Sequence, residues 1–98
     1  MQKAKRDFDK ARDWDKSNAS NILVHLIEEL GEVGRHVNFE EKYKTRKTGH
    51  EHGINKGELK REFAQVFMLL LQLANHYNID LDKAFSDELE MMERRFKR

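Results

Sequence analysis

The sequence predicts an all-α fold built from four helices, because helix-breaking residues are scarce and apolar residues follow a helical period. The 98 residues include no proline and only five glycines. Apolar side chains recur at steps of one, three and four residues, which places them on one face of a helix, whereas a strand would alternate them. No change of composition separates one part of the chain from another, so residues 1–98 are expected to form a single domain.

Charge and cysteine content exclude several classes of function. The chain carries 19 Lys and Arg against 18 Asp and Glu. It therefore lacks the strong positive field of a general nucleic-acid binder, and no nucleic-acid polymer is expected as a partner. The absence of cysteine rules out disulfides, thiolate nucleophiles and cysteine-based zinc sites.

The apolar segments of the sequence indicate which cellular location is expected for the protein. The basic start of the chain, residues 1–6, runs into Asp7 without the apolar stretch of a signal peptide. The longest apolar run, Val66 to Leu71, is far shorter than the roughly 20 residues of a membrane span. A cytoplasmic protein without a membrane partner is therefore expected.

The first predicted helix covers about Gln2 to Lys16 and is mostly charged. The few residues that offer it an apolar face for packing are Phe8, Ala11 and Trp14. The second predicted helix covers roughly Ala19 to Glu41 and carries an apolar stripe with a helical period, so it is expected to face the core. The stripe consists of Ile22, Leu23, Leu26, Ile27, Leu30, Val33 and Val37.

A basic loop and a third helix are predicted next. Between Lys42 and Gly57 the chain is basic, contains three glycines and has little apolar content, which is typical of an exposed loop. The third helix begins near Asn55, where Glu58 completes a variant of a capping box, and runs to about Tyr77. Apolar residues cover almost its whole circumference, so it is expected to be central or to contact another subunit.

The fourth predicted helix follows a short turn. Asn78 suits a left-handed conformation at the end of the third helix, and Asp80 can cap the fourth. The predicted inner face of this helix consists of Leu81, Ala84, Phe85, Leu89, Met92 and Phe96. Basic residues at its C-terminal end lie favourably for the helix dipole.

Carboxylates interrupt the apolar stripe of the second helix. Glu29 and Glu32 are three residues apart and project from one face, where their like charges repel each other. A divalent cation between them accounts for this repulsion, since magnesium prefers carboxylate and water oxygens. Glu62 and Gln65 repeat the spacing on the third helix. Antiparallel packing of the two helices would therefore bring both pairs together.

Two elements in this order resemble the MazG-like nucleotide pyrophosphohydrolases. Residues 28–32, Glu-Glu-Leu-Gly-Glu, are similar to the family's E-E-x-x-E element, and residues 62–65, Glu-Phe-Ala-Gln, resemble its E-x-x-D element. Residues 78–85 resemble the turn that opens the family's last helix, and residues 11–14 are similar to its start. The resemblance extends over about residues 11 to 98.

The resemblance implies a four-helix MazG-like bundle that assembles as a homodimer or homotetramer. It also implies hydrolysis of a nucleoside triphosphate between its α and β phosphates, which gives a nucleoside or deoxynucleoside monophosphate and pyrophosphate. Carried over by position, Glu29, Glu32 and Glu62 are the magnesium ligands, with manganese as an alternative ion. Gln65 takes the fourth ligand position, and Glu28 is the candidate catalytic residue that orients or deprotonates the attacking water.

The sequence departs from the family pattern at the fourth ligand. Gln65 stands where the pattern has Asp, so one of four carboxylates is lost and metal binding should weaken. Glu58, one turn before Glu62, is an alternative ligand in a rearranged site. In the last helix, Glu88 and Met92 stand where the family often has Lys and Asn. Two alternatives stay open: a helical module that binds a nucleotide or protein partner without turnover, and a purely structural module.

Four further residues are candidates for substrate binding. Trp14 is an expected stacking partner for a nucleobase, with a role as a packing anchor as the alternative. Lys44, Lys47 and Lys56 are candidates to bind the triphosphate, because ammonium groups attract phosphate oxygens. A solvated loop is the alternative for these lysines. Base preference depends on the shape of the pocket, which no spacing in the sequence reveals.

Overall fold

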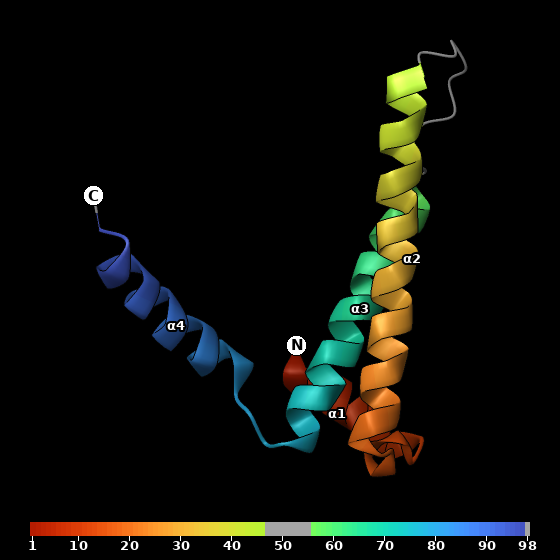
Figure 1. The fold of residues 1–98 in the computed structure, drawn as a ribbon. Helices are drawn as coiled ribbons and strands as arrows, with labels where there is room; N and C mark the ends of the chain where they lie inside the picture. The colour runs from red at the N-terminus through yellow and green to blue at the C-terminus, as the bar shows by residue number, and fades with distance from the viewer. Residues whose placement is uncertain (47–55, 98) are drawn as a thin grey trace.

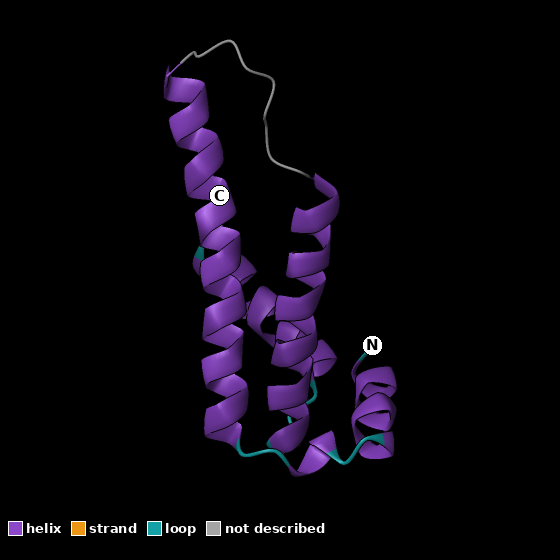
Figure 2. Cartoon of the chain, turned by 90° about the vertical axis from the view of Figure 1, so that its right-hand side faces the viewer, coloured by secondary structure: helices purple, strands orange, loops and turns teal. Residues whose placement is uncertain are grey.

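The computed structural model describes residues 1–46 and 56–97, and the side chains of all of these except residues 42–46. Over these residues the chain forms α-helices and one short 3-10 helix, η1, without any strand (Figure 2), which confirms the predicted all-α class. The elements are α1 (Gln2–Ala11), η1 (Trp14–Lys16), α2 (Ala19–Arg46), α3 (Lys56–His76) and α4 (Leu81–Arg95).

The first helix is shorter than predicted. α1 ends at Ala11 instead of continuing to Lys16. Asp13 adopts a left-handed backbone conformation with φ of 58°, which Asp tolerates better than most residues. The chain turns at this point, and the turn brings the Trp14 ring to 5.6 Å from the Phe8 ring, measured between centroids, in an edge-to-face arrangement.

α2 and α3 are the longest elements and lie side by side as an antiparallel hairpin (Figure 1). α2 ends at Arg46, whereas the sequence predicted an end near Glu41 and a loop from there on. Residues 42–46 contain neither Gly nor Pro, so nothing in them stops the helix. The rest of the predicted basic loop, with the proposed Asn55 cap, lies outside the described residues.

α1 lies beside the lower end of the hairpin (Figure 2), and polar side-chain contacts attach it there. Gln2 Nε2 donates to Asn75 Oδ1 at 3.1 Å and to the Ile79 carbonyl at 2.8 Å. Gln2 Oε1 accepts from the Leu81 amide at 2.8 Å. One side chain therefore joins the start of α1 to the end of α3 and to the turn that leads into α4.

The apolar core is small. Its buried members among the described residues are Ile22, Val33, Leu69, Leu71 and Ala74. The prediction that the whole stripe of α2 faces the core is wrong for several residues. Leu23, Ile27, Leu30 and Val37 are 46%, 59%, 55% and 38% exposed. The stripe is wider than the surface that α3 covers, so part of it faces away from the hairpin.

α4 has the predicted start but not the predicted surroundings. Asn78 has φ of 55°, and Asp80 Oδ1 accepts from the Lys83 amide at 3.2 Å, as the sequence indicated. However, α4 diverges from the hairpin (Figure 1), and none of its described residues is buried. Apart from the half-buried Leu81, the predicted inner face is exposed, with Phe85 at 65% and Phe96 at 67%.

The predicted four-helix bundle is therefore not completed within one chain. The radius of gyration is 17.6 Å, against about 13 Å for a compact domain of this size. None of the helices in the described part of the chain is long and apolar enough to cross a membrane.

Candidate functional site

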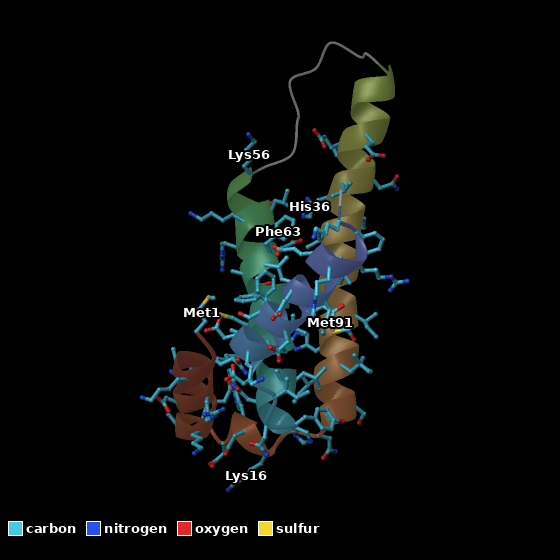
Figure 3. All side chains as sticks on the ribbon, turned by 90° about the vertical axis from the view of Figure 1, so that its left-hand side faces the viewer. Met1, Lys16, His36, Lys56, Phe63 and Met91 are labelled. Atoms are coloured by element: carbon cyan, nitrogen blue, oxygen red, sulfur yellow. The ribbon has the colours of Figure 1, made fainter. Side chains whose placement is uncertain are left out.

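The antiparallel hairpin brings the two acidic elements of the sequence to one stretch of the molecule. His36 on α2 and Glu62 on α3 meet with 3.2 Å between Nε2 and Oε1. Figure 3 shows His36 and Phe63, the sequence neighbour of Glu62, at a similar level of the two helices. One helical turn closer to the lower end of the hairpin lie Glu32 on α2 and Gln65 on α3. The predicted pairs thus come from adjacent turns of two facing helices.

Four polar residues of α2 share one face. His25, Glu29, Glu32 and His36 follow each other at steps of four, three and four residues, which is the period of a helix face. The side chains of Glu29 and His36 are 23% and 26% exposed, and that of Glu32 is 42% exposed. This face is therefore partly buried at Glu29 and His36, whereas the side chain of His25 is 59% exposed.

Each predicted glutamate ligand has a basic neighbour. Glu29 Oε1 lies 3.6 Å from His25 Nε2, and Glu32 Oε2 lies 2.8 Å from the guanidinium of Arg35. The third glutamate, Glu62, forms the interhelical contact described above. All three basic partners come from α2, the helix that also carries two of the three carboxylates.

Glu62 contains a buried oxygen that lacks a partner. Its Oε1 contacts His36, but its Oε2 is shielded from solvent and has no hydrogen-bond donor among the described residues. Leaving a buried polar atom unpaired costs about 1–3 kcal/mol, and more when the group is charged. A cation next to this oxygen would remove that cost. The surroundings of Glu62 therefore fit a bound metal ion.

The predicted ligands do not converge on a single metal position in the described part of the chain. In the part of the chain that the structure describes, no three His, Asp or Glu side chains lie close enough together to hold a metal ion. Glu29, Glu32 and Glu62 are instead spread along the hairpin. Each glutamate side chain has several rotatable bonds, so its carboxylate can move while the helix backbone stays in place.

A cavity of about 550 Å³ opens between the hairpin and the start of the chain. Phe8 and Trp14 line one part of it, and Glu29 and Gln65 line another. Most of its wall is apolar, and its volume lies within the roughly 300–1,000 Å³ of typical small-molecule sites. The cavity therefore combines an aromatic wall with two of the predicted ligand positions.

Trp14 is held in place at this cavity while half of its surface stays exposed. Its backbone carbonyl accepts from Gln72 Nε2 at 3.2 Å, and its ring packs edge-to-face with the ring of Phe8. Lys5 Nζ lies 5.9 Å from the Trp14 centroid and 5.3 Å from that of Phe8. Trp14 is 50% exposed, so a flat apolar ligand can still stack on it.

The remaining predicted site residues lie further from this arrangement. Glu28 is exposed on α2, and the helical step turns its side chain about 100° from that of Glu29. Lys56 is exposed at the upper end of α3 (Figure 3), about 9 Å along the helix from Glu62. Lys44 lies in the last turns of α2, but its side chain is outside the description. Lys47 lies outside the described residues altogether.

Sequence reasoning gave no role to His36 or to Phe8 as a partner of Trp14. A signal for His36 was present, because it follows Glu32 by four residues and therefore shares its face of α2. No local signal exists for the aromatic pair. Its geometry depends on the left-handed turn at Asp13, which the predicted continuous first helix did not contain.

Comparison with known families gives a match over most of the chain. Residues 17–98 match the MazG nucleotide pyrophosphohydrolase domain. This range contains both acidic elements and all of α2, α3 and α4, and it begins after α1 and Trp14. Searches among curated proteins and among solved structures gave no significant match.

Proposed function

The chain belongs to the MazG nucleotide pyrophosphohydrolase family, and we propose that it is an active, metal-dependent nucleoside triphosphate pyrophosphohydrolase. Water attacks the substrate, the bond between the α and β phosphates breaks, and a nucleoside monophosphate and pyrophosphate leave. The observation that carries this proposal is the placement of Glu29, Glu32 and Glu62 on the facing helices of one hairpin. Outside this family, a Glu–Glu pair and a Glu–Gln pair on helices would be more simply explained as solvated surface.

Magnesium is the expected cation, with manganese as an alternative. Glu29, Glu32 and Glu62 would hold it, with the amide oxygen of Gln65 in the fourth position. Carboxylate and amide oxygens are suitable ligands for such a hard ion, and the unpaired Oε2 of Glu62 supports a cation at this point. When bound, the cation supplies Lewis-acid stabilisation of the charge on the phosphates.

The cavity suggests how the substrate lies. The base stacks on Trp14 at the aromatic wall, and the triphosphate extends toward Glu29 and Gln65, which line the same cavity. In this arrangement Glu28 orients or deprotonates the attacking water from the exposed side of α2. Lys56, at the start of α3, attracts the distal phosphates, and the proposal gives the same role to Lys44 and Lys47.

The exposed apolar residues support a homo-oligomer. α4 has no buried residue among those described, and α2 and α3 each expose large apolar side chains. Single chains of this length have thin cores, and an interface with a second copy of the chain would cover apolar side chains that one chain leaves exposed. We therefore expect a homodimer or homotetramer in which α3 and α4 contact a second copy of the chain.

A module that binds nucleotide without turnover is the second candidate. It is favoured by the spread of the three glutamates along the hairpin and by the basic partner that each of them has. The neutral amide at Gln65 favours it as well, because it supplies no charge to the site.

Pyrophosphate release separates these candidates. Purified protein is incubated with a panel of ribo- and deoxyribonucleoside triphosphates, with magnesium, with manganese or with a chelator. Metal-dependent pyrophosphate together with an equal amount of monophosphate is the expected result, and the panel ranks the bases. A folded protein that binds nucleotide but releases no pyrophosphate from any substrate would refute the enzyme and favour the binding module.

A further inference from the structure

The contact between His36 and Glu62 has features that a simple interhelical ion pair does not require. Both side chains are largely buried, at 26% and 20% exposed, and Nε2 and Oε1 are 3.2 Å apart. The second oxygen of Glu62 is buried and has no donor within the described residues. An ion pair that served the fold alone would be more stable with this oxygen hydrogen-bonded or solvated.

We propose that His36 is itself a metal ligand, and that its imidazole makes the site favour a first-row transition-metal ion, such as Mn²⁺ or Co²⁺, over Mg²⁺. This proposal rests on the proposed function, because it needs a divalent cation at Glu62. It adds a ligand that neither the sequence reasoning nor the family match assigns. It also changes the class of cation that the site is expected to select.

The distance between the two groups supports shared ligation. Metal–ligand distances of about 2.1 Å in an octahedral shell place neighbouring ligand atoms roughly 3 Å apart. Nε2 of His36 and Oε1 of Glu62 are 3.2 Å apart, so both atoms can contact one cation after small shifts. The imidazole would then donate its lone pair to the metal instead of contacting the carboxylate.

The position of His36 on α2 supports the same conclusion. It follows Glu32 by four residues, and this spacing places two side chains on one helix face, as in helical metal sites built from residues four apart. Glu32 is held by Arg35 at 2.8 Å, but the Arg35 side chain is 77% exposed. An exposed pair of this kind contributes little stability, so Glu32 can exchange it for a metal at small cost.

The neutral side chain at Gln65 gives a chemical reason for His36 to act as a ligand. At this position an uncharged amide replaces the expected carboxylate, which weakens the site for every cation. Imidazole is a good donor for first-row transition metals, whereas Mg²⁺ prefers oxygen. A nitrogen from His36 therefore compensates for the lost carboxylate with Mn²⁺ or Co²⁺ but not with Mg²⁺.

Pulsed electron paramagnetic resonance of the protein with Mn²⁺ alone tests this directly, because it detects a nitrogen bound to the ion. The wild type is expected to show coupling to ¹⁴N, and His36→Gln is expected to lose it. Gln retains a polar group beside Glu62, so a general loss of packing does not explain the change. His76→Gln is the matched control, since His76 is exposed and lies about 21 Å along α3 from Glu62.

Binding affinities provide the second readout. Titration with Mn²⁺ should show a loss of about tenfold or more in His36→Gln, as expected for a lost ligand or its support. Mg²⁺ binding, measured by competition, should change much less. In the double variant His36→Gln with Gln65→Asp, the added carboxylate should raise Mg²⁺ affinity above that of His36→Gln and make Mg²⁺ the better competitor.

Two outcomes would overturn the proposal in distinguishable ways. If Mn²⁺ binds and the nitrogen coupling is absent from the wild type or persists in His36→Gln, His36 is not a ligand, while the cation of the proposed function is retained. If neither Mn²⁺ nor Mg²⁺ binds the wild type, the metal site of the proposed function fails together with this proposal.

Discussion

The lower end of the molecule, where α1 lies, and the carboxylate face of the hairpin differ in how completely their buried polar side chains are paired. At the lower end, Lys5 and Asp9 form an ion pair of 2.6 Å, with side chains only 10% and 3% exposed. Gln2 and Asn75 nearby exchange hydrogen bonds with each other and with the backbone. Further along the hairpin, Glu62 is also largely buried, yet one of its oxygens has no partner among the described residues.

Polar groups at the lower end are therefore paired within the chain, whereas one oxygen of Glu62 is left unpaired among the described residues. A buried ion pair is retained at low cost only if its charges are matched and hydrogen-bonded, and Lys5 with Asp9 meets the first condition. Glu62 is paired only in part, because His36 contacts Oε1 while Oε2 has no partner among the described residues. The lower end should therefore respond to mutation through stability, whereas the carboxylate face should respond through activity and metal binding.

Asp9→Ala is expected to give the largest effect and to act on stability. It leaves the buried Lys5 charge unpaired, so the free energy of unfolding should fall by about 3–5 kcal/mol. Urea denaturation followed by circular dichroism measures this. Asp7→Ala is the control, because its pair with Lys3 is 3.6 Å long and exposed, and it should cost less than about 1 kcal/mol. Equal effects of the two variants would contradict the structural role given to Asp9.

Glu29→Gln and Glu32→Gln test the other region and should act on turnover. Each keeps the size of the side chain but removes a charged ligand, so pyrophosphate release should fall at least about a hundredfold, or roughly 2.7 kcal/mol. Circular dichroism should show unchanged helical content. Glu90→Gln on α4 is the control and should retain activity. Full activity in both test variants would remove these glutamates from the site.

Gln2→Ala should have a smaller effect at the lower end. It removes the hydrogen bonds to Asn75, Ile79 and Leu81, which are partly exposed. We expect a loss of about 1–2 kcal/mol in unfolding free energy. Hydrogen exchange should show faster exchange of the Leu81 amide, which loses its acceptor. Unchanged protection of that amide would mean that Gln2 does not connect α1 to the start of α4.

Asp80→Ala should have the smallest effect and concerns α4, which contacts the lower end through Leu81 and has no buried residue among those described. Loss of the cap on the Lys83 amide should cost about 1 kcal/mol of helix stability. Chemical shifts of α4 should move toward coil values while those of α2 and α3 stay unchanged. Asp82→Ala, in the same first turn, is a control that leaves the cap in place. If the shifts of α2 and α3 moved as well, α4 would be coupled to the hairpin more strongly than its exposure indicates.

The glutamates of the candidate site were predicted from their spacing, and their role as ligands stays a prediction. Glu29, Glu32 and Glu62 were identified from positions three residues apart, and the match to the MazG domain covers all of them. His36 was on the same predicted face, but nothing in the sequence states which residue of α3 lies opposite. That pairing depends on the register of two helices, which is decided by how their apolar side chains pack.

The sequence by itself determined the features that depend on near neighbours. The all-α class, the start and end of α3 within a residue or two, the left-handed Asn78 and the Asp80 cap all follow from interactions between residues a few positions apart. Only the tertiary structure decided the burial of Asp9, the contact of His36 with Glu62, and the departure of α4 from the hairpin. Each of these features depends on how residues that are distant in sequence pack against one another. No local sequence pattern encodes that packing.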